Sequence, residues 1–548
     1  MRLQWRDDIS VHPAVRIYST RYRKGAAAAW ARSVVVAILA PLLLAGCASA
    51  PPLPDRPASP MLQPATDTPL ARVVDASTPN PSLTGFRLLP NGFSSLDARV
   101  ELTRRAVHSL DVQYYLIAND RTGRLFMRSL RDAALRGVRV RLLVDDLYTV
   151  GGDEMFRGLA AFENVEVRLF NPFCCGRQSL ATKYLASLAT FERLNHRMHN
   201  KLFIADGVVA VMGGRNIADE YFARGPTSNF VDMDVLVVGG AMQRLRGIFD
   251  TYWNSRVSYP VEAIVAASGD RQDQRQAFDH LVDDGEQMKA IPAPAIDMLG
   301  HRPLGRDLDA DALQLVWGPA VAFADQPEKV NATSVESAQA MSAQMNIMDR
   351  VGASERTVVI SSPYFVPGPA GVQAFRHLTR RNVKVAILTN SLAANDVPLV
   401  HAGYMRYRVE LLRNGVDLYE LSPTRMIRND ESLLPSMSLG RLHTKAAVID
   451  ESIVYLGSVN LDPRSASTNT ELGLLAMCPA LATQVPEVIG LAQRGSAYRL
   501  RFASDGASLE WLATTDSGDV VLTQEPEATP LMHLQNLLFG PFVPEQLL

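Results

Sequence analysis

A polar block that runs from a histidine to an asparagine occurs twice in this chain, and the repetition restricts the fold more than any other feature. The copies run from His199 to Asn216 and from His443 to Asn460, 17 positions in each case (216 − 199 and 460 − 443). Each contains H-x-K-x4-D, then an apolar run and a glycine before the asparagine. With ten histidines and seven lysines, one H-x-K-x4-D match arises by chance in roughly one such chain per hundred. Two matches with equal offsets therefore indicate a duplicated folding unit.

The hydrophobic pattern before each block predicts the same order of elements. In the first half we expect a helix over 95–106, a strand over 109–116, a helix over 123–135 and a strand over 138–144. In the second half we expect a helix before Ser354, a strand over 357–362, a helix over 371–380 and a strand over 383–389. The order strand, helix, strand is typical of parallel crossover units. The predicted fold class is therefore α/β, with helices on the faces of the sheets.

The length of 548 residues is more than one hydrophobic core usually supports, so we expect two domains. The first domain is predicted over 86–268 and the second over 312–548, and the weakly periodic, charged stretch 269–311 is interpreted as a linker. Short strands within 509–522 and a terminal helix are expected to cap the second domain.

The N-terminus has the pattern of an export signal. Basic residues precede an apolar run over 33–45, which ends in Leu44-Ala45-Gly46-Cys47 and resembles a bacterial lipobox. We expect residues 1–47 to be a signal peptide and Cys47 to be acylated, which would anchor the protein to a membrane. An uncleaved signal anchor is the alternative. Residues 48–85 are Pro-rich and are predicted to form a disordered tether. The acylated Cys47 and the uncleaved signal anchor both place the body of the protein in the cell envelope facing the periplasm, at the inner or the outer membrane.

The repeated block brings together groups that can act on a phosphodiester. Each histidine and lysine is expected inside a β-strand, where alternate side chains project the same way, so His199 lies beside Lys201 and His443 beside Lys445. Asn216 and Asn460 follow glycines, at which the chain can bend and return the amide toward these pairs. One imidazole could attack phosphorus while the other protonates the leaving oxygen. The lysines and asparagines would then hold the non-bridging oxygens.

Acidic residues are expected to orient the two imidazoles. Glu471 leads an apolar strand 28 positions after His443 (471 − 443), and Asp232 has the matching place in the first copy. Asp234 is the alternative partner of the first histidine. The motif aspartates Asp206 and Asp450 have the opposite pleat parity from the lysines, which favours a structural role.

No metal or other cofactor is expected. Each motif histidine has a lysine two positions away, and this positive charge would repel a cation. With Cys47 lipidated, Cys174, Cys175 and Cys478 remain, an odd number without zinc-ligand spacing. We interpret them as buried or incidental thiols, with a catalytic or metal-binding role as the alternative.

The paired blocks resemble the twin HKD motifs of the phospholipase D superfamily, from about residue 85 to the C-terminus. The resemblance implies two similar α/β/α domains in a pseudo-twofold arrangement, with mixed sheets flanked by helices and one active site between them. It further implies a covalent phosphohistidine intermediate without a metal. By this resemblance His199 is the nucleophile and His443 the general acid.

Within the superfamily, four stretches look like bacterial cardiolipin synthases of the C type: 109–116, 194–201, 213–221 and 252–255. The resemblance implies transfer of a phosphatidyl group to phosphatidylglycerol, with phosphatidylethanolamine as a further candidate substrate. The insertion between Asn171 and Leu194 is consistent with an apolar approach for acyl chains.

Three other functions are compatible with the same centre. A hydrolytic phospholipase D differs only in whether water reaches the intermediate. An exported phosphodiesterase or nuclease would need a basic groove, which the net charge of −2 disfavours. A catalytically silent phosphate-binding module is disfavoured because both motifs are intact. The oligomeric state is left open.

Overall fold

The computed structural model describes residues 52–54, 58–60, 62–64, 66–173, 175–187, 190–283, 296–332, 334–425, 438–489, 495–515, 517–540 and 543–545. The predicted signal peptide and the acylation site Cys47 lie outside this part of the chain. Among the described residues, no helix combines the length and the apolar character needed to span a bilayer.

The first half is built on one mixed sheet, which within the described residues has the order β10-β1-β8-β6-β5-β2-β3-β4-β9. Its strands are β1 (Thr84–Leu89), β2 (Ser109–Tyr114), β3 (Arg139–Asp145), β4 (Val165–Phe170), β5 (Leu202–Ala205), β6 (Val209–Gly213), β8 (Asp234–Gly239), β9 (Ser258–Pro260) and β10 (Val316–Gly318). The helices are α2 (Pro69–Ser77), α3 (Gly92–Arg105), α4 (Arg121–Leu135), α5 (Asp153–Leu159), α6 (Leu180–Ala186), α7 (Phe191–Asn195), α8 (Met242–Trp253), α9 (Val261–Ile264), α10 (Arg271–Val282) and α11 (Leu304–Asp309).

The second half has a mixed sheet of order β11-β18-β17-β16-β12-β13-β14-β19-β20-β21 in the described residues. Its strands are β11 (Ala320–Ala324), β12 (Thr357–Ser361), β13 (Lys384–Asn390), β14 (Asp417–Leu421), β16 (Ala446–Ile449), β17 (Ile453–Gly457), β18 (Leu472–Met477), β19 (Ala497–Phe502), β20 (Leu509–Thr515) and β21 (Gly518–Leu522). The helices are α12 (Val335–Ala340), α13 (Ala343–Gly352), α14 (Gly368–Arg380), α15 (Pro398–Arg413), α17 (Pro479–Val488) and α18 (Pro530–Phe539).

The centres of the two sheets match strand for strand. The run β8-β6-β5-β2-β3-β4 of the first sheet corresponds to β18-β17-β16-β12-β13-β14 of the second. In both, a parallel three-stranded part joins an antiparallel part at the strand that follows the H-x-K block. The α/β class and the duplication are therefore confirmed, and each predicted helix and strand is present within a few residues of its expected ends.

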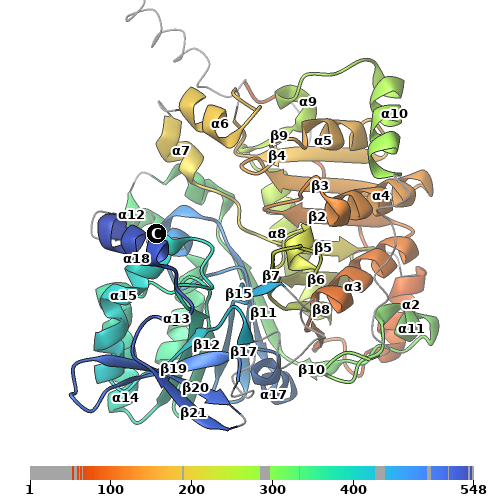
Figure 1. Cartoon of the computed structure of the whole chain (residues 1–548). Coiled ribbons are helices and arrows are strands. Elements are labelled where there is room, and N and C mark those ends of the chain that lie inside the picture. The colour runs from red at the N-terminus through yellow and green to blue at the C-terminus, as the bar shows by residue number, and fades with distance from the viewer. Residues whose placement is uncertain are drawn as a thin grey trace, which may run out of the picture.

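The halves are joined side by side (Figure 1). The short strands β7 (Ser228–Val231) and β15 (Leu439–Leu442) pair in parallel across the junction. Beneath them lies one apolar cluster with side chains from both halves, such as Leu202, Val235, Ala446 and Leu474. Burial of a shared core of this kind holds the two halves in a single arrangement.

The predicted domain boundaries need correction at two places. The tether was expected to reach residue 85, but the first half already begins at α2, whose Leu70 and Val73 are buried in the core. Thr68 caps this helix and Pro69 is its first residue, a favourable start that the high proline content around it concealed.

The described parts of the expected linker 269–311, residues 269–283 and 296–311, also belong to the first half. In α10, Phe278 and Val282 are buried in the first core, and Arg131 of α4 forms ion pairs with Asp279 and Asp283. Strand β10 pairs with β1 in the first sheet, so the second half begins after it, at β11 and not at residue 312. The weak periodicity of this stretch reflects helices that bury only a narrow face. The predicted cap is present as β19 to β21 and α18.

Candidate active site

The two H-x-K blocks meet at the junction of the halves, and the backbone of each is bound by the other half. His199 N donates to Thr470 O at 2.8 Å, and His443 N donates to Val231 O at 2.8 Å. Both histidines precede the strands of their blocks, β5 and β16, where we had expected them inside a strand. This position lets each imidazole reach across the junction.

The carboxylates that hold the imidazoles come from the opposite halves. His199 Nδ1 lies 3.0 Å from Glu471 Oε2, and His443 Nδ1 lies 2.6 Å from Asp232 Oδ2. Glu471 and Asp232 each contact a motif imidazole, but the expected pairing within each copy is wrong. The reason is geometric: each acid directly follows the residue, Thr470 or Val231, whose carbonyl binds the other block. The role of the two acids in orienting the imidazoles for catalysis stays a prediction.

The alternative acid, Asp234, has a different role. It forms a buried ion pair with Arg99 at 3.0 Å and accepts a hydrogen bond from Ser95, both on α3. Asp234 therefore anchors a helix to the sheet, and Asp232 is the residue that contacts a motif imidazole.

The surroundings of the two acids differ. Glu471 accepts from the hydroxyls of Ser458 and Ser465, at 2.5 and 2.9 Å. In the first block, Gly214 stands where the second has Ser458, and a Cβ there would lie 2.4 Å from Asp232 Oδ1. The glycine is required by this close approach, and Asp232 has fewer donors. Ser458 and Ser465 were not predicted. The signal for Ser458 is a hydroxyl at a repeat position that is glycine in the other copy, whereas the position of Ser465 holds Tyr221 there.

Both motif lysines are buried beside their histidines. Lys201 Nζ donates to His199 O at 2.5 Å, and Lys445 Nζ donates to His443 O at 2.6 Å. Burial lowers the pKa of Lys445 to about 8, and it lowers the pKa of Lys201 well below its usual value. An anion placed between these side chains would favour their charged forms and raise both pKa values.

Burial also favours neutral imidazoles in the free protein. It lowers the pKa of His199 to about 4, an effect that Glu471 opposes and Lys201 reinforces. Burial and then Lys445 lower the pKa of His443 well below its usual value. Burial alone would raise the pKa of Glu471, but the neighbouring His199 and Lys201 bring it below its usual value. Because an ionised carboxylate only accepts hydrogen bonds, the proton of the neutral His199 imidazole belongs on Nδ1, and Nε2 keeps its lone pair.

The asparagines close the two blocks. Asn216 Nδ2 donates to the Tyr221 hydroxyl at 2.9 Å, and Asn460 N donates to the Ser465 hydroxyl at 3.1 Å. Among the described residues, neither Asn216 Oδ1 nor Asn460 Oδ1 has a hydrogen-bond partner. These buried amide groups therefore retain capacity for a ligand.

Aromatic rings border both histidines. The Tyr115 ring lies 5.1 Å from the His199 ring, and the rings of Tyr221 and Phe230 each lie 5.0 Å from His443. Lys201 Nζ lies 5.3 Å from the Tyr115 ring centre. These rings reduce the access of water to the site and strengthen its electrostatic interactions.

The motif aspartates each bind backbone N–H groups at the start of a strand. Asp206 accepts from the backbone N–H groups of Val107, His108 and Ser109, where β2 begins. Asp450 accepts equivalently from the three residues 355–357 before β12. Each carboxylate thus fixes the start of the strand next to its own motif strand.

Replacing Asp206 by alanine is expected to lower the free energy of unfolding by about 3 kcal/mol, because three N–H groups, one buried and two partly buried, lose a charged acceptor. Asp450→Ala, at a partly exposed position, is expected to cost about 1 kcal/mol. Urea denaturation of both variants measures the difference. Loss of turnover in Asp206→Ala without loss of stability would contradict the structural assignment.

In the described part of the chain, no group of three or more His, Cys, Asp or Glu side chains is arranged to hold a metal ion. Metal-independent chemistry stays a prediction. Cys478 is a buried thiol at the start of α17, which agrees with the interpretation as a core residue. Cys174 lies outside the described residues.

Comparisons with known proteins agree with this geometry. A family model described as "Cardiolipin synthase, PLD-like domain" matches residues 100–253 and 347–489, one block in each range. Cardiolipin synthase C of Escherichia coli (strain K12) is 37% identical over 468 residues, covering 83% of this chain and 94% of that protein. An uncharacterized protein of Helicobacter pylori is 33% identical over 417 residues, with coverages of 74% and 78%.

Among solved structures, phosphatidylserine synthase from Haemophilus influenzae Rd KW20 superimposes with a TM-score of 0.52 and 14% identity. The match covers 84% of this chain and 95% of that one, which shows that the two-halved fold is shared.

Proposed function

The chain belongs to the PLD-like family of the cardiolipin synthases, and from this membership we propose that it is a phosphatidyltransferase that works through a phosphohistidine. It would move a phosphatidyl group from one phospholipid to the hydroxyl of phosphatidylglycerol and thereby form cardiolipin. The observation that carries the proposal is the crossed arrangement of the site. Two imidazoles, each held at Nδ1 by a carboxylate of the other half, share one buried site with two lysines.

In the first step His199 Nε2 attacks phosphorus. A P–N bond forms, the bond from phosphorus to the leaving oxygen breaks, and His443 gives that oxygen a proton. In the second step His443 takes the proton of the acceptor hydroxyl, whose oxygen attacks phosphorus as the P–N bond breaks. Lys201 and Lys445 would stabilise the negative charge on the non-bridging oxygens in both steps.

The proton on His443 is explained by the substrate. In the free protein, burial and the nearby lysines keep the pKa of this imidazole well below its usual value. A phosphodiester is an anion, and an opposite charge at contact distance raises the pKa of an imidazole. Binding of the substrate would therefore supply the charge that makes His443 an acid.

Two apolar features support a lipid substrate. A cavity of about 560 Å³, lined mainly by apolar side chains of α12 to α14, lies against Leu461, the residue after Asn460. Helix α18 exposes four leucines: Leu531, Leu534, Leu537 and Leu538. Neither feature suits a nucleic acid, which requires positive charge along its phosphates.

The proposal includes attachment to a membrane through Cys47, with the body facing the periplasm. It rests on the lipobox-like sequence that ends the apolar run 33–45. Such an anchor would keep the site next to its lipid substrates.

Incubation of the purified protein with vesicles of phosphatidylglycerol and phosphatidylethanolamine is expected to yield cardiolipin, measured by lipid mass spectrometry. Phosphatidic acid as the sole product would contradict transfer and favour a hydrolase. Cleavage of plasmid DNA, with no change in the lipids, would favour an exported nuclease. A His199→Ala protein serves as the control for contaminating enzymes.

A further inference from the structure

Two residues outside the H-x-K blocks occupy the same place in both halves. Strand β3 ends at Asp145 and β13 ends at Asn390. Val140 of β3 pairs with the second residue of β2, and Val385 of β13 pairs with the second residue of β12. Asp145 and Asn390 each lie five positions after these valines (145 − 140 and 390 − 385). The ends of these strands face the segments that carry the catalytic histidines.

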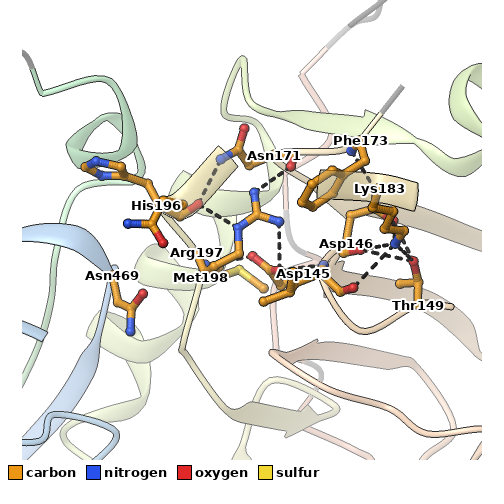
Figure 2. Close-up of polar contacts among 12 residues, drawn as sticks. Asp145, Asp146, Thr149, Asn171, Phe173, Lys183, His196, Arg197, Met198 and Asn469 are labelled. Atoms are coloured by element: carbon orange, nitrogen blue, oxygen red, sulfur yellow. Dashed lines mark hydrogen bonds and ion pairs between the residues drawn. The ribbon is translucent and has the colours of Figure 1, made fainter. Parts of the chain in front are cut away.

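In the first half, Asp145 binds the backbone just before His199. Asp145 Oδ2 accepts from Met198 N at 2.8 Å, while Oδ1 accepts from Leu147 N at 2.9 Å and from Arg197 Nη1 at 3.2 Å. Figure 2 shows this carboxylate between Met198 and the guanidinium of Arg197. Asp145 is fully buried. All its partners are donors.

In the second half, Asn390 binds the residue just before His443 in a different way. Asn390 Oδ1 accepts from Leu442 N at 2.8 Å, and Nδ2 donates to Leu442 O at 3.0 Å. Nδ2 also lies 3.4 Å from Pro363 O. This amide faces one donor and two acceptors.

We propose that Asp145 and Asn390 are positioning residues, which set the location of His199 and His443 by binding the peptide group before each imidazole. Neither residue touches an imidazole. Each acts from its own half, while the carbonyl of Thr470 or Val231 binds the histidine N–H from the other half. The histidine backbone is thus held on two sides.

The chemical identity of each positioning residue follows from its partners. A carboxylate only accepts, so it satisfies the three donors around Asp145, and an amide there would place its N–H groups against one of them. An amide both donates and accepts, so it suits Asn390, and a carboxylate there would meet the carbonyl oxygens of Leu442 and Pro363. The exchanges Asp145→Asn and Asn390→Asp therefore create mismatches of nearly unchanged size.

A buried arginine extends the support of the first histidine. Arg197 Nη2 donates to Asn171 O and Nε donates to His196 O, both at 2.7 Å. Asn171 Nδ2 donates in turn to His196 O at 2.8 Å, and Figure 2 shows these groups as one network. The corresponding arginine of the second half, Arg441, is only partly buried. Asn171, where the insertion begins, therefore contributes to the support of the backbone before His199.

The test rests on the proposed function and separates its two steps. With a phosphatidyl ester of p-nitrophenol, the leaving group departs without a proton. The burst of p-nitrophenolate then reports attack by His199, and the following steady rate reports release through His443 as a base. The two positioning residues should therefore affect different phases of one time course.

Asp145→Asn is expected to slow the burst about 100-fold, the scale of an ångström-sized misplacement, with KM little changed. Asn390→Asp is expected to leave the burst within about twofold and to slow the steady rate about 100-fold. Arg197→Lys keeps the positive charge but loses the planar guanidinium with its several donors, and it should slow the burst about tenfold. It serves as a second variant if Asp145→Asn does not fold.

Asp111→Asn is the matched control, because the Asp111 side chain is a buried acid on β2 that pairs with Arg141 at 2.6 Å and not with the backbone before either histidine. This variant should lower the melting temperature and leave both phases unchanged. Equal slowing of both phases in Asp145→Asn and Asn390→Asp, or slowing in Asp111→Asn, overturns the positioning roles. A wild-type protein that gives neither a burst nor a phosphatidyl adduct by mass contradicts the covalent mechanism itself, and with it the assignment of each residue to a step.

Discussion

His199→Ala is expected to lower turnover about 10⁴-fold or more, because the reaction loses its nucleophile and the covalent route with it. With the p-nitrophenol ester, this variant should release no burst. Intact-protein mass spectrometry should detect no phosphatidyl adduct. Both histidines are buried at the junction, so alanine leaves a cavity and lowers the free energy of unfolding. We expect the variants to fold in spite of this cost.

His443→Ala should behave differently with the same ester. His199 can still attack, because the leaving group needs no proton, so one equivalent of p-nitrophenolate and a mass adduct are expected. Release should be slow because no base activates the acceptor. An adduct in His199→Ala and none in His443→Ala would reverse the order of the two histidines. Full turnover in both variants would contradict the proposed site altogether.

The residues of the site could be predicted because the repeat carries them at equal offsets. His199 and His443, with Lys201 and Lys445, occur in a pattern that chance rarely produces twice. The strands and helices next to them were predictable for the same reason, since each half supports the interpretation of the other.

The crossed pairing could not be predicted from spacing. Glu471 follows His443 at a fixed distance in the chain, but that distance says nothing about the half toward which the acid points. The pairing depends on tertiary contacts of Thr470 and Val231 across the junction. Asp145 and Asn390, by contrast, end equivalent strands seven positions after Val138 and Val383 (145 − 138 and 390 − 383). Alignment of the two copies could have identified them.

The boundaries were misplaced for a compositional reason. Prolines around α2 suggested disorder, although Pro69 is a favourable first residue of a helix. The charged surface of α10 concealed the few apolar residues, Phe278 and Val282, that attach it to the first half. Local composition describes the exposed side of such helices and says little about the narrow face that decides where they belong.

The crossed acids lead to the second large effect. Glu471→Gln and Asp232→Asn are each expected to lower turnover about 10³-fold, because an amide can present its NH₂ to Nδ1 and favour the wrong imidazole tautomer. Since Glu471 contacts His199, its variant should lose the burst and the adduct, as His199→Ala does. Since Asp232 contacts His443, its variant should keep the burst and accumulate the adduct.

Asp234→Asn is the matched control for Asp232→Asn, because Asp234 lies two positions away, is equally buried and pairs with Arg99 of α3. This variant should lose stability but keep the wild-type ratio of burst to steady rate. Pairing within each half would produce the opposite pattern, with an adduct in Glu471→Gln and none in Asp232→Asn. The two outcomes differ in which protein carries the added mass, so one mass spectrum of each variant decides between them. An adduct in Asp232→Asn and none in Glu471→Gln would also mean that neither half alone can hold its histidine in the reactive tautomer. Activity would then require both halves of the chain.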